Sequence, residues 1–287
     1  MMDQKLIDLH DEYQHASLGR RAFIRKLTVL AGGTAAANTV LSLLDSNYAL
    51  AENVADDDPR LETRYINYPG ATGDVRARLA RPKGDAKLPT VVVIHENRGL
   101  NPHSEDVTRR LALAGFLAIA PDALSPLGGT PPDSDEARAR MRKLDRRSTL
   151  DNFLAAVKYL KTHPQSTGKV GAIGFCWGGA MANQLAVNAP ELSAAVPFYG
   201  RQADAEDVPK IRASLLLHYA GLDKRINSGI ADFETALKQA SVDYTIHMYE
   251  GVNHAFHNDT SVARYNYEAA ELAWQRTIEF LTEKLQT

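Results

Sequence analysis

Short runs of apolar residues alternate with longer amphipathic segments over most of the chain. The apolar runs predict strands at 90–95, 116–120, 193–199, 213–219 and 243–250, and the amphipathic segments predict helices at 103–114, 148–162, 228–241 and 261–285. Before them, Leu61 to Arg81 is expected to form two antiparallel strands, broken by Pro69-Gly70 and Thr72-Gly73. This alternation predicts an α/β fold with a mostly parallel, twisted sheet and helices on both faces.

One apolar run leads directly into a cysteine that is flanked by glycines. The run Lys169–Ile173 is followed by Gly174-Phe175-Cys176-Trp177-Gly178-Gly179, and small residues that can form a helix come next (180–187). A strand, a sharp turn and a helix around G-x-C-x-G are typical of a nucleophile elbow with sulfur in place of a hydroxyl. The helix N-terminus would favour a thiolate at Cys176. A buried structural cysteine is the alternative, and the flanking glycines favour the elbow.

A carboxylate and a histidine follow, each just beyond the carboxyl end of an expected strand. Asp223 comes after the strand at 213–219, and His254 comes after the strand at 243–250. Open α/β sheets place their sites at these ends, and a cysteine nucleophile needs a base that is itself oriented by a third group. Taken alone, Asp223 could equally be a turn or cap residue, and His254 alone carries no more weight. The ordered trio is stronger than its members.

These motifs resemble those of the dienelactone hydrolase family of the α/β-hydrolase superfamily. The likeness covers roughly Leu61 to Thr287 and rests on four motifs: Gly174–Gly179, Gly221-Leu222-Asp223, His254-Ala255-Phe256, and His95-Glu96-Asn97-Arg98-Gly99 after the strand at 90–94. It implies an α/β-hydrolase fold with Cys176 as nucleophile, His254 as base and then acid, and Asp223 as the carboxylate that orients it. It also implies that Glu96 contacts the resting thiol and helps to generate thiolate. Without the resemblance, Glu96 could be a helix-capping or surface carboxylate.

Acyl transfer also needs backbone N–H groups that stabilise the oxyanion. By the superfamily pattern these come from Trp177 and Asn97. The expected reaction is thiol-dependent hydrolysis of a small-molecule ester or lactone through an acyl-thioester, with no cofactor and no metal. The alternative is a protein that keeps the fold for binding or interaction and has no hydrolase activity.

In the family, two arginines hold the substrate's carboxylate, and this chain has neither of them. The segment Pro121–Pro126 contains no arginine, and Asn258 stands four residues beyond His254. Arg98 and Arg201 could compensate, although surface positions are the simpler expectation for both. A neutral or differently charged ester or lactone is therefore expected as the substrate.

Two further features concern the surroundings of the pocket. Tyr199, at the end of a buried strand, is a candidate wall of the pocket or else a core residue. The Pro/Gly-rich and then charged segment 128–147 is expected to be an exposed insertion. Its helical part is either a partial lid or simply a solvated helix, and the second is the plainer expectation.

The first 51 residues resemble a twin-arginine export signal. Arg20-Arg21 stand within Ser17–Lys26, the apolar stretch Leu27–Leu44 follows, and Ala49-Leu50-Ala51 forms a cleavage pattern before Glu52. We expect the twin-arginine machinery as a partner, a periplasmic location, a signal or N-terminal arm at 1–51 and a single α/β-hydrolase domain at 52–287. The acidic residues before the arginine pair are unusual for a signal (Asp3, Asp8, Asp11 and Glu12). The alternative is an arm that a cytoplasmic protein retains and that packs on the domain or on a partner subunit.

The composition is that of one globular enzyme and narrows the choice of partners. Hydrophobic residues make up 44% of the chain and charged residues 24%, as in a typical globular domain. The net charge of −2 gives no indication of a basic surface that would bind nucleic acid. Cys176 is the single cysteine, so no internal disulfide is expected. His247, His254 and His257 straddle a strand end and a loop, so no metal site is expected among them. Gly32, Gly33 and the charged flanks of the apolar stretch argue against a permanent membrane span. The sequence leaves the oligomeric state open.

Overall fold

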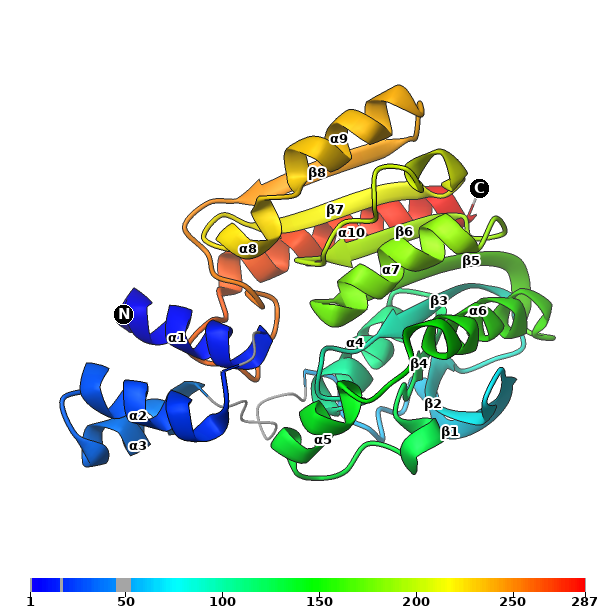
Figure 1. The fold of residues 1–287 in the computed structure, drawn as a ribbon. Helices are drawn as coiled ribbons and strands as arrows, with labels where there is room; N and C mark the ends of the chain where they lie inside the picture. Colours follow the sequence, from blue (N-terminus) through cyan, green and yellow to red (C-terminus); the bar gives the residue numbers. More distant parts are fainter. Residues whose placement is uncertain (1, 16–17, 45–52, 287) are drawn as a thin grey trace.

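A computed structural model describes residues 2–15, 18–44 and 53–286. Its centre is an eight-stranded sheet with the order β1-β2-β4-β3-β5-β6-β7-β8, in which β1, β2 and β4 pair antiparallel and all other neighbours pair parallel. The predicted mostly parallel sheet is therefore confirmed (Figure 1). The strands are β1 (Leu61–Gly70), β2 (Gly73–Pro82), β3 (Leu88–Ile94), β4 (Leu117–Pro121), β5 (Ser166–Phe175), β6 (Ala194–Phe198), β7 (Ser214–Ala220) and β8 (Tyr244–Tyr249).

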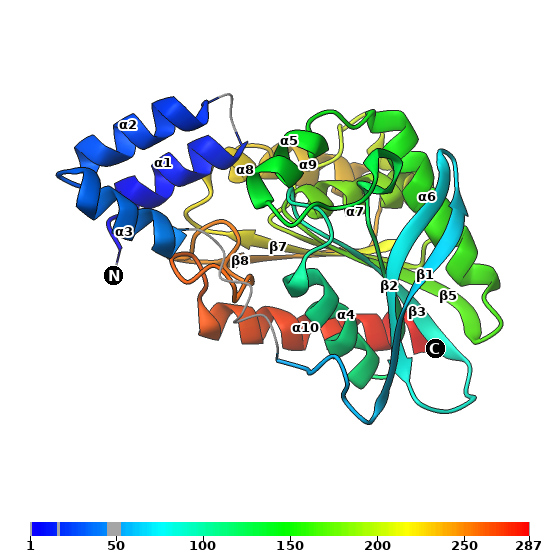
Figure 2. The same ribbon diagram turned by 90° about the horizontal axis from the view of Figure 1, so that it is seen from below.

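Helices cover both faces of this sheet, as the alternation of elements predicted. Figure 2 shows α4 and α10 on one face and α6, α7 and α9 on the other. The helices after the first strand pair are α4 (Pro102–Leu113), α5 (Ser134–Met141), α6 (Arg146–Thr162), α7 (Trp177–Asn188), α8 (Lys224–Asn227), α9 (Ile230–Gln239) and α10 (Tyr267–Gln286), with short 3₁₀ turns at Ser125–Leu127 and Val208–Lys210.

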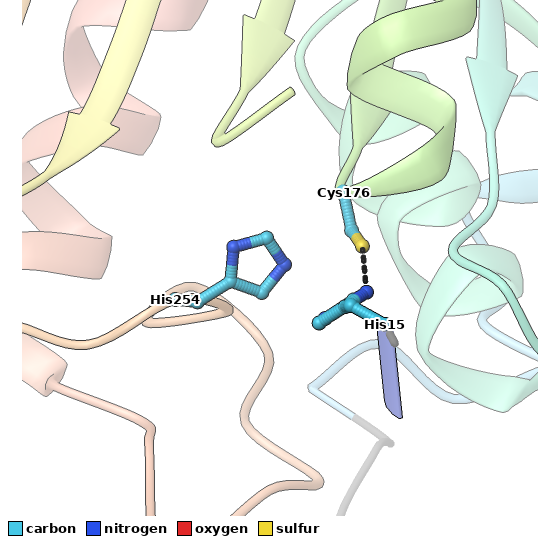
Figure 3. A group of neighbouring side chains, drawn as sticks. All are labelled: His15, Cys176 and His254. Carbon is cyan, nitrogen blue, oxygen red and sulfur yellow. Dashed lines mark hydrogen bonds between the residues drawn. The ribbon is translucent and has the colours of Figure 1, made fainter. Parts of the chain in front are cut away.

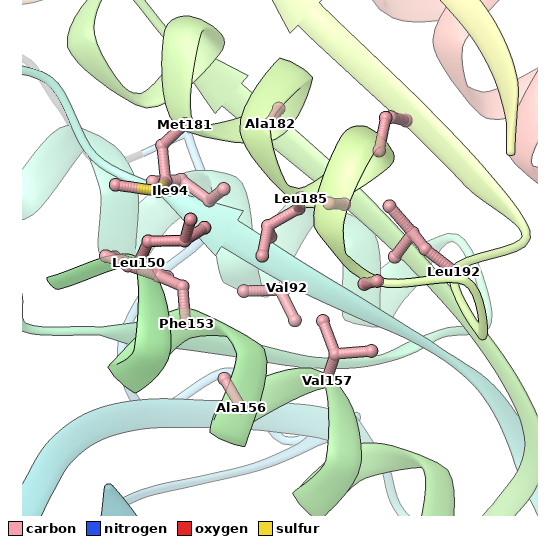
Figure 4. Close-up of a cluster of buried hydrophobic side chains, with 14 of the residues drawn as sticks. Val92, Ile94, Leu150, Phe153, Ala156, Val157, Met181, Ala182, Leu185 and Leu192 are labelled. Atoms are coloured by element: carbon pink, nitrogen blue, oxygen red, sulfur yellow. The ribbon is translucent and has the colours of Figure 1, made fainter. Parts of the chain in front are cut away.

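The central strand β3 is formed by a continuous apolar run, and its position in the sheet explains why no polar residues alternate along it. Val92 and Ile94 belong to the buried cluster under α6 and α7, where Phe153 and Leu185 pack (Figure 4). Their neighbours in the sequence, Val91 and Val93, belong to the cluster on the opposite face. Because helices cover both faces, every residue of the strand after Leu88 is buried, and the usual alternation of apolar and polar residues is lost.

The closing helix begins later than the expected residue 261. The side chain of Asn266 accepts a hydrogen bond from the Ala269 N–H at 3.0 Å, which caps the helix, and α10 begins at Tyr267. Residues 250–266 instead form turns that carry His254 and Asn258. The six residues taken from the expected helix thus extend the loop that builds the site.

The chain before residue 45 forms a small helical unit, here called the N-terminal arm (residues 2–15 and 18–44). Its helices α1 (Gln4–His15), α2 (Arg20–Leu30) and α3 (Thr34–Leu44) share an apolar cluster that includes Tyr13, Phe23 and Leu27. Figure 1 shows the arm beside the sheet, with α1 nearest to the loop that follows β8. The cleavage pattern Ala49–Ala51 lies outside the described residues.

The arm also contains the expected arginine pair and the apolar stretch. Arg20 lies at the start of α2 and forms an ion pair with Asp135 of α5. Across the described residues, no single helix is both long and apolar enough to cross a membrane. The pair Arg20–Leu30 and Thr34–Leu44 meets that test together, but the two helices are bent by 114°.

Candidate active site

Cys176 occupies a strained turn between β5 and α7, as expected of a nucleophile elbow. Its backbone has φ 56° and ψ −110°, a region that L-residues rarely adopt. A Cβ on Gly174 would lie 2.0 Å from the Gly178 carbonyl oxygen, and a Cβ on Gly178 would lie 2.2 Å from the Ile94 carbonyl oxygen. Both positions therefore require glycine, and the absence of a side chain at Gly178 lets the turn pack directly against β3.

His254 and Asp223 come from the loops after β8 and β7 and form a buried pair. His254 Nδ1 donates to Asp223 Oδ2 at 2.5 Å, and the two residues are 2% and 8% exposed. The other oxygen of Asp223 accepts from the Ile226 N–H at 3.2 Å and so caps α8. Asp223 is thus both the expected cap residue and the partner of the imidazole.

The sulfur and the free side of the imidazole face each other. A ring nitrogen of His254 lies within 4.8 Å of the Cys176 sulfur, and His254 Nε2 has no hydrogen-bond partner among the described residues. Figure 3 shows one nitrogen of the His254 ring turned toward Cys176. The structure therefore brings Cys176, His254 and Asp223 together at the carboxyl ends of parallel strands, with a gap that a small side-chain movement would close.

Electrostatics favours a charged imidazole at this place. Burial lowers the pKa of His254, but the negative charge of the Cys176 thiolate and the hydrogen bond to Asp223 outweigh it and raise that pKa to about 10. For Asp223, burial raises the pKa, and the hydrogen bond and charge of His254 lower it further than burial raises it. A charged His254 imidazole is thus stabilised by Asp223 on one side and would be stabilised by an anionic sulfur on the other.

Glu96 follows β3 and lies next to this group, held by an unexpected partner. Asn258 Nδ2 donates to Glu96 Oε2 at 2.9 Å, while Glu96 Oε1 is buried and has no partner in the described part of the chain. Asn258 stands where the family resemblance places an arginine, and here its amide holds a carboxylate of the site. Glu96, Cys176 and His254 line one small cavity.

The two residues expected to supply oxyanion N–H groups flank the thiol. Trp177 is the first residue of α7, so its N–H has no acceptor within the helix, and its indole stacks on His95 with 5.5 Å between the ring centroids. Asn97 borders the same cavities as the thiol, and its side chain donates to the Gln14 carbonyl oxygen at 3.3 Å. Both residues are placed at the sulfur, and their roles remain predictions.

A cavity of about 820 Å³ opens beside Cys176 and is bordered by Tyr199. The Tyr199 ring is buried, lies 4.9 Å from the His254 ring between centroids, and carries a hydroxyl with no partner among the described residues. Arg201 borders this cavity, and the buried Arg98 borders the smaller one beside Glu96. Arg98 is therefore buried near the thiol, which the sequence alone did not favour, whereas Arg201 is exposed, as the simpler expectation had it.

The large cavity is lined by more arginines than carboxylates, and two of these arginines, Arg138 and Arg147, form ion pairs with Asp135 and Asp151. Its walls include one carboxylate, Asp204, and six arginines: Arg138, Arg142, Arg146, Arg147, Arg201 and Arg225. Four of the six come from the segment 128–147, which therefore borders the site, as the lid interpretation required. None of these six arginines stands at either of the two positions at which the family has an arginine and this chain does not.

His15 is the site residue that sequence reasoning missed. It ends α1, its Nδ1 lies 4.0 Å from the Cys176 sulfur, and its ring centroid lies 4.7 Å from that of His254 (Figure 3). Burial, together with the charges of His254 and Arg225, holds the pKa of His15 well below its ordinary value. The only signal in the sequence was the alternative of an arm that packs on the domain.

Comparisons with known proteins agree with this geometry. The model of the dienelactone hydrolase family matches residues 75–285. A protein of Saccharolobus solfataricus named as a carboxymethylenebutenolidase is 33% identical over 254 residues, which cover 76% of this chain and 97% of the relative. A protein of Bradyrhizobium sp named as a 2-oxo-3-(5-oxofuran-2-ylidene)propanoate lactonase is 33% identical over 229 residues, 74% of this chain and 91% of the relative.

A solved structure supports the same assignment. A dienelactone hydrolase from Klebsiella pneumoniae superposes with a TM-score of 0.70 at 27% identity, over 77% of this chain and 98% of that chain. The α/β-hydrolase fold is therefore confirmed, and so is the prediction of a hydrolase of carboxylic esters or lactones at the level of the family. This chain belongs to the dienelactone hydrolase family.

Proposed function

We propose that this protein hydrolyses carboxylic esters or lactones through a thioester on Cys176. The observation that carries the proposal is the convergence of Cys176, His254 and Asp223, with the 2.5 Å contact orienting the imidazole. The thiolate attacks the carbonyl carbon and forms a C–S bond. The C–O bond to the leaving alkoxide then breaks, and the alkoxide takes the Nε2 proton of His254. A water molecule gives a proton back to His254 as it attacks the thioester, which releases the acid and the thiolate.

The backbone N–H groups of Trp177 and Asn97 are the proposed donors to the oxyanion. Two such donors supply several kcal/mol of transition-state stabilisation. Glu96 is proposed to accept the thiol proton when substrate enters, which its unpartnered Oε1 would allow. Amides should be poor substrates, because the tetrahedral intermediate expels thiolate in preference to an amine.

We further propose that the preferred ester carries an anionic group. The expectation of a neutral or differently charged substrate rested on the two missing arginines, whereas six other arginines border the cavity along with one carboxylate. Guanidinium groups bind carboxylates in bidentate fashion. Anion recognition has thus moved, in this proposal, from the family's two positions to the rim formed by α5, α6 and the loop after β6.

Two matched substrates test these statements separately. The p-nitrophenyl ester of butyric acid is neutral, and the mono-p-nitrophenyl ester of glutaric acid adds one carboxylate. Wild type that a chelator has freed of metal should hydrolyse both and prefer the second, and Cys176→Ala should hydrolyse neither while keeping its circular dichroism spectrum. Equal activity of wild type and Cys176→Ala would end the thiol mechanism, whereas preference for the neutral ester would end only the anionic substrate. An inactive wild type would favour the binding-protein alternative.

Export through the twin-arginine machinery to the periplasm is proposed for the same chain. Arg20-Arg21, the apolar stretch after them and the pattern before Glu52 support it. Cleavage there would remove the arm, and His15 with it. N-terminal sequencing of protein from a periplasmic extract decides the matter: a start at Glu52 is expected, and a start at Met1 or Met2 would favour the retained arm.

A further inference from the structure

Three potential metal ligands from distant parts of the chain meet at the thiol. Cys176, His254 and His15 each offer one ligand atom, and these atoms lie within 4.8 Å of one another (Figure 3). Thiolate sulfur and imidazole nitrogen are ligands that Zn²⁺ prefers. Sets of three protein ligands leave a fourth tetrahedral position for water. The sequence predicted no metal site among His247, His254 and His257, which lie close together in the chain. His15 lies far from them in the sequence and was not part of that prediction.

His254 is already arranged as a metal ligand. Its Nδ1 is bonded to Asp223, and its buried Nε2 has no partner among the described residues and is turned into the group. A carboxylate behind an imidazole is the usual way in which proteins fix the ring orientation and tautomer of a histidine ligand. A buried nitrogen without a partner in the described part of the chain is therefore aimed at the proposed ion.

The body of the protein holds His15 at this place through several contacts with α1. The carbonyl oxygens of Tyr13 and Gln14 accept hydrogen bonds from Arg138 at 2.8 Å and from Asn97 at 3.3 Å. Asp11 pairs with Arg264 at 3.2 Å, and Gln4 donates to Asn253, the residue before His254, at 2.6 Å. These contacts run along α1 from Gln4 to Gln14 and hold the helix on the body of the protein, with His15 beside the sulfur.

We propose that the chain with its arm attached binds one Zn²⁺ ion between His15, Cys176 and His254. Ligand distances of about 2.3 Å to sulfur and about 2.0 Å to nitrogen require the three atoms to approach the ion by about 1 Å from their positions in the structure. His15, as the last residue of α1, can make most of that movement. The bound ion would occupy both the sulfur and Nε2 of His254. The arm therefore keeps the thiol from substrate and from oxidation until it is removed.

Metal binding by the full chain tests the proposal without using hydrolysis. Zn²⁺ is titrated against a chromophoric chelator, and Co²⁺ is used as a spectroscopic substitute. Wild type should bind one ion, and the Co²⁺ form should show a thiolate-to-cobalt charge-transfer band that Cys176→Ala lacks. His15→Ala should weaken Zn²⁺ binding at least about 100-fold, and Asp223→Asn, which acts behind His254, about 10- to 100-fold.

The control is His163→Ala, since His163 caps the C-terminus of α6 at the opposite end of β5. Its affinity for Zn²⁺ should equal that of wild type. Absence of binding by wild type, or equal affinity of wild type and His15→Ala, would overturn the proposal.

A second readout covers the case in which His15→Ala disturbs the arm. One equivalent of Zn²⁺ should slow alkylation of Cys176 by iodoacetamide in wild type at least tenfold, and it should have little effect in His15→Gln, which keeps a polar side chain of similar size. Equal protection in the two proteins would contradict the role of His15. Because alkylation needs no turnover, a failed zinc site and a failed hydrolase give different results.

Discussion

At the scale of single residues, Asn258 and Glu96 define what is particular to this site. The amide of Asn258 donates to one oxygen of Glu96 and leaves the other oxygen buried beside the thiol cavity. A guanidinium at position 258 would bring a charge that neutralises the carboxylate. The neutral amide holds Glu96 in place without bringing a positive charge to it, which suits the role proposed for Glu96 in accepting the thiol proton.

Glu96→Gln tests that role. A glutamine can still accept from Asn258 but cannot take a proton, so the rise of Cys176 alkylation by iodoacetamide with pH should move to higher pH. The rate is measured from about pH 5 to about pH 9, the range in which thiols ordinarily titrate. Glu271→Gln, an exposed position on α10, serves as the control. A profile that stays in place or moves to lower pH would remove Glu96 from thiolate formation.

Asp223→Asn tests the buried ion pair through its dependence on pH. The pKa of Asp223 is lowered in the folded protein from its ordinary 3.8, so the pair stabilises the fold above that value and this stabilisation is lost as pH falls through the lowered pKa. Asparagine is also a good N-cap, so the variant removes the charge and keeps the cap of α8.

The variant should unfold at a lower urea concentration than wild type near pH 6, and the difference should shrink toward about pH 3. Asp232→Asn, at an exposed position on α9, controls for a general loss of negative charge. A difference that is constant over this range would mean that the carboxylate of Asp223 contributes no charge interaction.

At the scale of elements, the turn from β5 into α7 depends on its glycines. Gly178→Ala places a Cβ 2.2 Å from the Ile94 carbonyl oxygen and 2.6 Å from that of His95, and backbone on both sides leaves no room to adjust. We expect a loss of about 3 kcal/mol in the free energy of unfolding, measured in urea, with loss of thiol reactivity. Gly19→Ala is the matched control, because nothing lies within 4 Å of its Cβ. Equal stability of the two variants would refute the close packing of the elbow.

Helices and strands could be predicted from the sequence where neighbouring residues alone determine the backbone conformation. The apolar run of β3 and the glycines around Cys176 each mark one conformation, and both predictions were right. The predicted start of α10 was wrong by six residues. The cap at Asn266 is a local contact with Ala269, but the turns around Asn258 that precede it depend on the contact of Asn258 with Glu96. Such contacts join residues 162 positions apart and leave no periodic signal.

At the scale of the whole molecule, two segments that carry no recognisable active-site motif, the N-terminal arm and residues 128–147, also contribute residues to the site. The arm brings His15 to the sulfur, and the segment 128–147 contributes four of the six arginines around the cavity. The sequence indicated only that an arm and an insertion exist. Which surfaces they cover depends on contacts such as Arg20 with Asp135 and Arg138 with Tyr13.

Removing two of these arginines tests the charge of the cavity as a whole. Arg146→Gln with Arg201→Gln should lower kcat/KM for the glutaric half-ester about tenfold, since a hydrogen bond to a charged group contributes about 1.5 kcal/mol. Hydrolysis of the neutral butyric ester should change little. Arg212→Gln, an exposed arginine just before β7, is the control. An equal loss for both esters would show that these arginines do not recognise the anion.

The most direct test of the account is to identify the atom that carries the acyl group during turnover. The protein, freed of metal by a chelator, is mixed with the butyric ester, quenched in acid within the first turnover and digested, and its peptides are analysed by mass spectrometry. We predict one butyryl group on the peptide that contains Cys176, which hydroxylamine removes and which is absent from Cys176→Ala. An acyl group on another residue, or rapid turnover with no acylated Cys176 at any quench time, would contradict the thioester mechanism.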